Sequence, residues 1–388
     1  MRSRGLKSGR SRLIASPPSL APAAAGRVKH PLNLVLLGLA AAAAMAGLWG
    51  GLIRLGLPIA GSSLADMHGP LMVCGLFGTV ISLERAVALE RRWALAAPVA
   101  FGSGGVCILI GAPTAGAVLF LAGGLVLFAA SVVVFLLQRA LFTFSLAVGA
   151  LCMAAGDAVW MLTSDARASV GLWIAFFVGT IAAERLELSR AIQTTGASRA
   201  TFAGLLLLLV AGASLGIDSL FGRWLLGGSL LGLAAWLYWC DIARHVVRRP
   251  GPTRFFASGM LAGYAWLGVS GGLIAFGSDL DLAYDLQLHT VFLGFVLSML
   301  MAHALIILPA VLGIHLTFSK SLYLPLALLH VSLLLRVLGS TIAPSELRLF
   351  SGPVTVASLA AFAILVTWAE LRARRLRRAK SASANRGI

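Results

Sequence analysis

Long apolar runs alternate with short polar, glycine- or proline-containing segments along nearly the whole chain. A helix needs about 20 mostly apolar residues to cross the hydrocarbon layer of a bilayer, and twelve runs reach that length. Their ranges are 32–55, 64–84, 94–112, 115–137, 141–163, 169–190, 201–221, 224–243, 255–277, 286–313, 321–341 and 351–371. The pattern predicts an all-α, polytopic membrane protein: a twelve-helix transmembrane domain over 31–371, with basic tails at 1–30 and 372–388.

The positions of lysine and arginine give an independent prediction of topology, because cytoplasmic loops carry the positive excess. All but five of the 31 basic residues fall in the two tails and in alternate connections on one side. The five exceptions are Arg54, Arg167, Arg223, Arg336 and Arg348. This asymmetry predicts a multi-pass protein of the cell inner (plasma) membrane, with both termini in the cytoplasm.

The composition is typical of a membrane protein and argues against a nucleic-acid partner. Mean hydropathy is +0.93, and 59% of the residues are hydrophobic whereas 12% are charged. A soluble domain could not cover such a chain with polar surface, so its solvent is the lipid bilayer. The net charge of +17 lies in the tails and short loops, without an aromatic-interleaved basic patch, and we expect no nucleic-acid partner.

One short sequence recurs. FGTVISLERAVALER, at 77–91, resembles FVGTIAAERLELSRA, at 177–191, and both copies close helices that run from outside to inside. The copies are four helices apart, which predicts three repeated sets of four helices, with spans two, six and ten in equivalent places. The alternative for each Glu-Arg pair is an interfacial ion pair that anchors a helix end.

Ionisable residues in the hydrocarbon region are costly and are candidates for function. The chain has five: His68, His289, His303, His330 and Asp157. Helix geometry places His68 and His289 at one depth, about 5 Å below the outer edge, and His303 roughly 21 Å deeper than His289. Two imidazoles at one depth can clamp an iron porphyrin. We therefore predict that His68 and His289 bind one haem iron and that His303 does not.

The neighbours of His68 leave room for a flat ligand. Met72 lies on the same helix face, and glycines 69, 75 and 78 allow close approach. The same features have another explanation. Small residues also let membrane helices pack closely, and a lone histidine can hydrogen-bond a backbone carbonyl.

These residues resemble a known family. His68-Gly69-Pro70-Leu71-Met72 resembles the His-Gly-x-x-Met element on the second helix of haem-copper oxidase subunit I, and Gln287-Leu288-His289 resembles its tenth-helix His-x-His element. The resemblance implies that His68 and His289 are the axial ligands of a low-spin haem of the b type near the outer face. Arg336, near the outer end of the eleventh span, and Arg54 would then be placed to pair with the haem propionates, the alternative for both being an arginine that reaches to the membrane interface.

Two departures from that family change the expected function. Gln287 replaces the histidine that would hold an oxygen-reducing haem, and there is no histidine between Gly171 and Leu220, where the copper ligands would lie. An oxygen-reducing haem-copper centre is not expected. The chain is more similar to the simplified relatives in this superfamily that lack the copper-site histidines, such as the NnrS-type haem membrane proteins linked to nitric oxide.

Three classes of function remain open. The first is a haem protein that transfers electrons from a respiratory-chain donor or handles nitric oxide or another small gas. The second is a secondary transporter, in which Asp157, His303 and His330 would relay protons. The third is a non-catalytic assembly factor of a respiratory complex.

Overall fold

The computed structural model describes residues 31–61, 63–188, 195–277, 281–314, 316–342 and 345–384. Every regular element in these ranges is a helix, and twelve helical segments are long and apolar enough to cross a membrane. The predicted all-α, polytopic fold with twelve spans is confirmed. The predicted tail at 1–30 lies outside the described residues.

The spans follow one another along the chain with short connections. The first six are α1 (Pro31–Leu55); α2, η1 and α3 in series (Ser63–Pro70, Leu71–Gly78 and Thr79–Leu89); η2 and α4 (Arg92–Leu95 and Ala96–Leu109); α5 (Pro113–Leu137); α6 (Leu141–Thr163); and α7 (Ala166–Leu188). The other six are α8 (Gly196–Leu215); α9 (Leu220–Cys240); α11 (Pro252–Phe276), after the short α10 (Ala243–Val246); α12, η4 and α13 in series (Asp281–His289, Thr290–Leu297 and Ser298–Leu312); η5 and α14 (Lys320–Leu322 and Tyr323–Thr341); and α15 (Ser345–Ala384).

Two spans differ clearly from their predicted ranges: α15 extends the twelfth span, predicted over 351–371, to Ser345–Ala384, and the seventh is shifted from 201–221 at both ends. Helix α8 begins five residues earlier, at Gly196, and ends at Leu215. Gly216 then adopts a φ of +78°, a conformation that glycine reaches without steric cost, and the chain turns there. The apolar pair Leu220-Phe221, which the hydrophobic pattern assigned to this span, instead begins α9.

The two helices that carry the paired histidines each contain a π-helical segment. In the second span η1 follows Pro70, which has no backbone N–H to donate, and in the tenth span η4 follows His289 directly. Thr290, the first residue of η4, donates its hydroxyl to the carbonyls of Leu286 and Gln287. A π-helical turn widens the helix and often marks a functional site.

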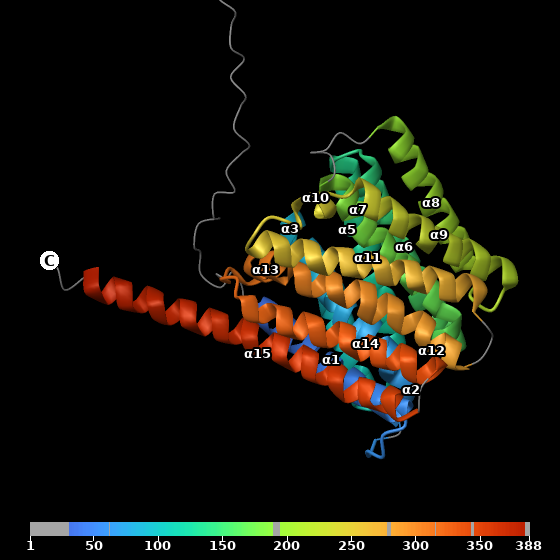
Figure 1. The fold of residues 1–388 in the computed structure, drawn as a ribbon, viewed down its shortest axis with the longest axis horizontal. Helices are drawn as coiled ribbons and strands as arrows, with labels where there is room; N and C mark the ends of the chain where they lie inside the picture. The colour runs from blue at the N-terminus through green and yellow to red at the C-terminus, as the bar shows by residue number, and fades with distance from the viewer. Residues whose placement is uncertain are drawn as a thin grey trace, which may run out of the picture.

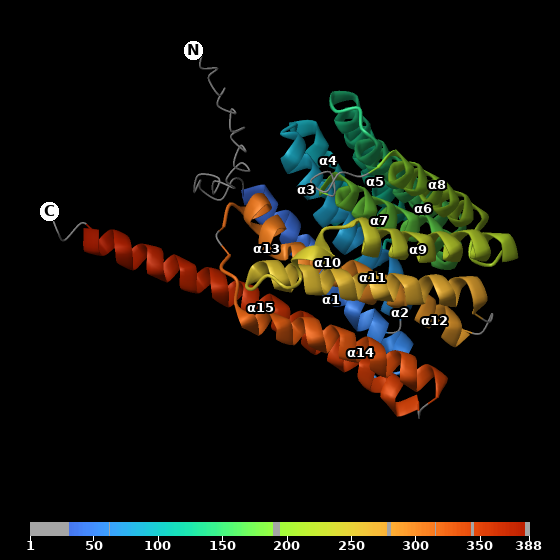
Figure 2. The same ribbon diagram turned by 45° about the horizontal axis from the view of Figure 1, so that its top comes forward.

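The spans differ in how much of their surface is covered by other helices. Helix α7 is central: 78% of the residues in its most apolar 18-residue stretch are buried. The corresponding share for α15 is 22%. Figures 1 and 2 show α15 at the edge of the bundle, with its C-terminal half projecting beyond it. In Figure 1, α2 and α12 lie at one end of the bundle, and α3, α10 and α13 lie at the opposite end, from which α15 projects.

Spans two, six and ten meet through three phenylalanines. The ring centres of Phe77 and Phe177 are 5.1 Å apart, and those of Phe177 and Phe292 are 5.6 Å apart. These are the three spans that a fourfold-helix repeat would make equivalent. Their contact accords with the proposed repeat, which itself stays a prediction.

Candidate functional site

The rings of His68 and His289 lie next to each other although the residues are more than 200 positions apart in the chain. Their centres are 6.2 Å apart and their planes are inclined by 17°. His68 comes from α2 and His289 from the end of α12, so the two helices approach each other just before each widens into its π-helical segment. The two histidines therefore lie at one level of the helical bundle, as a common depth would require.

His68 is held by α1. Its Nδ1 lies 2.6 Å from the carbonyl oxygen of Gly47, and its ring packs on Gly51, where an added Cβ would stand 2.8 Å from both Cε1 and Nδ1. An added Cβ on Gly50 would collide with the carbonyl of Leu64. Three small residues on one face of α1 therefore bring α2 close and fix the orientation of the imidazole.

His289 has a charged partner instead. Its Nδ1 lies 2.8 Å from the backbone carbonyl oxygen of Asp285 and 3.1 Å from the Oδ1 atom of the same residue. Arg336 of α14 donates to both carboxylate oxygens of Asp285, at 2.9 and 3.0 Å. The Nε atom of Arg348 of α15 lies 3.7 Å from Oδ2. Asp285 thus joins a histidine to two arginines from the last two helices.

The hydrogen bonds of both rings use Nδ1. An imidazole that donates through Nδ1 has its lone pair on Nε2, the arrangement found in histidines that bind metals. Both Nε2 atoms are thereby available to a ligand.

A cavity of about 690 Å³ surrounds the two histidines. Pockets that bury cofactors and drug-sized ligands occupy about 300–1,000 Å³, so this one can take a large organic group. Its walls combine apolar side chains, including Met72, Phe77, Trp173 and Phe292, with charged ones. The cations Arg54, Arg336 and Arg348 all line it. Arg54 forms no ion pair among the described residues.

Met72 lines the cavity one helical turn after His68. Its thioether lies against α1, since a Cβ added to Gly47 would be 2.9 Å from Sδ. The π-helical segment that begins at Leu71 carries Met72, Val73 and Phe77 along the cavity wall.

Asp157 lies behind the cavity wall rather than in it. Its carboxyl is fully buried, and Oδ1 accepts hydrogen bonds from Nε1 of Trp173 at 3.0 Å and from the thiol of Cys74 at 3.2 Å. Trp173 lines the cavity. Oδ2 has no hydrogen-bond partner among the described residues. Asp157 therefore supports the wall through Trp173 and touches the second span through Cys74.

His303 lies far along α13 from His289. Its Nδ1 is 2.7 Å from the carbonyl oxygen of Met299, and Phe256 stacks edge-on against its ring at 4.5 Å. The guanidinium of Arg185 lies over the same phenylalanine at 5.5 Å, and its Nη1 is 3.6 Å from the sulfur of Met260. The prediction that His303 does not join the His68–His289 site agrees with these positions.

Asp241, which interacts with Arg185, is the residue that directly follows α9, beyond the membrane-spanning segment. It accepts a hydrogen bond from the hydroxyl of Tyr264 and one from the backbone N–H of Ile242. Burial raises the pKa of this carboxyl, and these hydrogen bonds oppose the shift.

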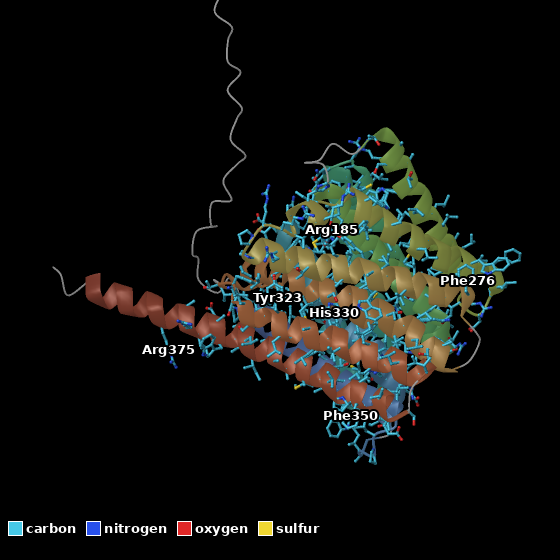
Figure 3. The ribbon with its side chains drawn as sticks, viewed as in Figure 1. Arg185, Phe276, Tyr323, His330, Phe350 and Arg375 are labelled. Carbon is cyan, nitrogen blue, oxygen red and sulfur yellow. The ribbon has the colours of Figure 1, made fainter. Side chains whose placement is uncertain are left out.

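His330 is in a third environment. Its Nδ1 accepts a hydrogen bond from Nε1 of Trp266 at 3.1 Å, and Figure 3 shows the residue about midway along α14. No contact among the described residues joins Asp157, His303 and His330. In the described residues these three side chains lie in three separate environments.

Gln287 is the residue that the resemblance to the oxidase family sets against a histidine. Its side-chain amide donates to the carbonyl of Leu273 at 3.0 Å, and its backbone carbonyl accepts from the Ser270 hydroxyl. Gln287 therefore ties the tenth span to α11 and does not line the cavity.

The described residues contain no group of three or more His, Cys, Asp or Glu side chains that could hold a metal ion. A porphyrin supplies four ring nitrogens to its iron, so two axial histidines complete such a site. A site for a bare metal ion would need more protein ligands.

Several residues that position the histidines were not singled out by the sequence. The glycine triplet of α1 could have been found, because GLWGG places small residues at helical spacing. Asp285 and Arg348 give no such signal, because their meeting depends on how α12, α14 and α15 pack.

No curated protein and no solved structure gives a significant match to this chain. A family model does match, over residues 33–371, which include the paired histidines, the cavity and nearly all of the twelve-span domain. The chain therefore belongs to the family described as "Domain of unknown function (DUF8744)".

Proposed function

We propose that this protein is an integral membrane haem protein in which His68 and His289 are the two axial ligands of a b-type haem iron. The observation that carries the proposal is the pair of rings 6.2 Å apart inside a cavity of about 690 Å³. Under this proposal the chain is a relative of haem-copper oxidase subunit I that lacks the copper-site histidines, as NnrS-type proteins do.

The ring separation fits ligation of one metal. A metal–imidazole bond of about 2.1 Å, plus roughly 1.1 Å from the bonded nitrogen to its ring centre, puts two opposed rings about 6.4 Å apart. The observed 6.2 Å agrees with this distance. The two Nδ1 hydrogen bonds support the same role, because they fix the tautomer in which Nε2 can bind.

The cavity also suits the periphery of a porphyrin. Its apolar walls match the macrocycle, and its cations match two propionates. Of the two arginines that the sequence offers for this contact, Arg336 uses Nη1 to bind Asp285. Arg54, which lies in the cavity without an ion pair among the described residues, is the stronger candidate for a propionate partner.

The proposed ligand set favours electron transfer. A bound haem supplies one-electron chemistry, and with histidine on both sides of the iron there is no open position for a substrate. In this arrangement His68 and His289 would bind the iron, Gly47 and Asp285 would orient the rings, and Phe77, Trp173 and Phe292 would exclude water. A respiratory-chain donor would supply the electron, and a link to nitric oxide would be indirect.

We further propose that the protein lies in the cell inner (plasma) membrane with both termini in the cytoplasm and the histidine cavity near the outer face. Four of the five outside arginines, Arg54, Arg167, Arg336 and Arg348, line that cavity. Most other basic residues fall in the tails and in the connections on the opposite side. A reporter that works only in the cytoplasm should be active when fused after Ala384. A reporter that works only outside the cytoplasm should be inactive at the same site.

The test of the haem proposal is a reduced-minus-oxidised absorption spectrum of protein purified from haem-replete cells. We expect the bands of a low-spin b-type haem in the wild type, and their loss in H68A and in H289A. H330A is a matched control, because it removes an intramembrane imidazole that lies outside the cavity. Wild-type protein that folds but carries no haem, and takes none up when haem is added, would refute the proposal.

A further inference from the structure

The two proposed ligands differ in what holds them. His68 faces a neutral acceptor, the carbonyl of Gly47, whereas His289 faces the carboxylate of Asp285 as well as a carbonyl. A carboxylate that accepts from a ligating imidazole makes that imidazole a stronger electron donor. A stronger donor favours the oxidised iron and so lowers its reduction potential.

Asp285 does not act alone. Arg336, whose side chain is 7% exposed, binds both of its carboxylate oxygens, and Arg348 approaches Oδ2 at 3.7 Å. Each arginine withdraws charge from the carboxylate and adds a positive charge near the iron site. Both effects oppose that of Asp285, so the three side chains form a set with opposite influences on the potential.

The close packing of α14 against α15 brings these two arginines to Asp285. Gly339 of α14 lies in direct contact with the backbone of Arg348, where a Cβ would collide with the Arg348 nitrogen. The close approach places the start of α15 beside α14, so that Arg336 and Arg348 can reach one carboxylate. Both arginines also line the cavity.

On the basis of the proposed function, we infer that Asp285 is a positioning residue that sets the donor strength of His289, and that Arg336 and Arg348 counteract it. The cluster of Asp285, Arg336 and Arg348 thus tunes the reduction potential of the iron. This role differs from that of a simple ion pair that holds the helices together. An ion pair of that kind would affect haem content and stability but would not predict the sign of a potential shift.

The test is a spectroelectrochemical titration of purified, haem-loaded protein. D285N removes a negative charge and weakens the donor, so it should raise the potential. R336Q and R348Q should lower it. For Asp285 and Arg336 we expect shifts equivalent to at least a tenfold change in the oxidation equilibrium, which is about 59 mV for one electron. D285E, which keeps the carboxylate, should restore most of the wild-type value.

R372Q is the matched control for loss of one arginine from α15. Arg372 lies over the ring of Trp368, away from the cavity, and its loss should leave the potential unchanged. If D285N fails to bind haem, the direction of the potential shifts in R336Q and R348Q tests whether the cluster tunes the reduction potential. Unchanged or raised potentials in those variants, with haem still bound by His68 and His289, would overturn the inference and leave the haem proposal intact. Absence of haem from the wild type would instead refute the haem proposal.

Discussion

The contact between Gly51 and His68 allows a sharp test of how tightly the proposed iron site is specified. A Cβ built on Gly51 would lie 2.8 Å from two atoms of the His68 ring, whereas ordinary contacts begin at 3.4 Å. In G51A the ring must therefore retreat by about 0.6 Å or α1 must move away from α2. Gly50, already in contact with the backbone of Leu64, shows that α1 and α2 are packed at their closest approach.

A displacement of that size exceeds what a metal site tolerates. Metal–ligand distances hold to within about 0.2 Å, and disturbing the groups that orient a ligating histidine costs roughly 10–100-fold in affinity. We expect the same loss of haem affinity in G51A, equivalent to about 1.4–2.7 kcal/mol. Haem added back to stripped protein and followed by absorption would give the dissociation constant directly.

G38A is the control on the same helix. A Cβ at Gly38 meets nothing within 4 Å, so this variant makes the same chemical change without touching His68. Both variants gain the helix propensity of alanine, so the difference between them isolates the contact. If G51A binds haem as tightly as G38A, the Gly51 contact does not orient the ligand and the reasoning is wrong.

Three further predictions concern the rest of the helical domain. D157A should destabilise the protein by about 1–3 kcal/mol in detergent unfolding, because it leaves the buried Trp173 N–H unpaired, and D157N should cost less because it keeps an acceptor. H330A should leave the absorption spectrum of the haem-loaded protein unchanged, since His330 does not line the cavity. D218N breaks the exposed ion pair with Arg167 and should cost under about 1 kcal/mol, with the wild-type advantage fading in high salt.

Much of the architecture could be predicted from the hydrophobic pattern, because each span must satisfy its backbone inside a bilayer and so must be a long apolar helix. The pairing of His68 with His289 could also be predicted, since helix rise converts sequence position into depth. The end of the seventh span was predicted too late, because apolar Leu220 and Phe221 were counted in it although Gly216 ends α8 and Ser219 caps the start of α9.

The surroundings of the histidines could be predicted only in part. Arg336 was placed near the outer end of its helix, and it lines the cavity, but its partner Asp285 lies 51 positions away. Contacts of this kind depend on which helix faces meet, and apolar composition does not determine that when every span is hydrophobic on most sides.

The π-helical segments η1 and η4 also constrain how this family can change by insertion and deletion. A π-helical turn is an α-helix that has accepted an extra residue, so deletion of one residue within 71–78 would restore the tighter helix. Because the wider turn absorbs that residue, Glu84 and Arg85 beyond it would keep nearly the same orientation relative to His68. The change would instead fall on the segment that carries Met72, Val73 and Phe77, so a single-codon deletion there would reshape the cavity wall and leave both ends of the second span in register.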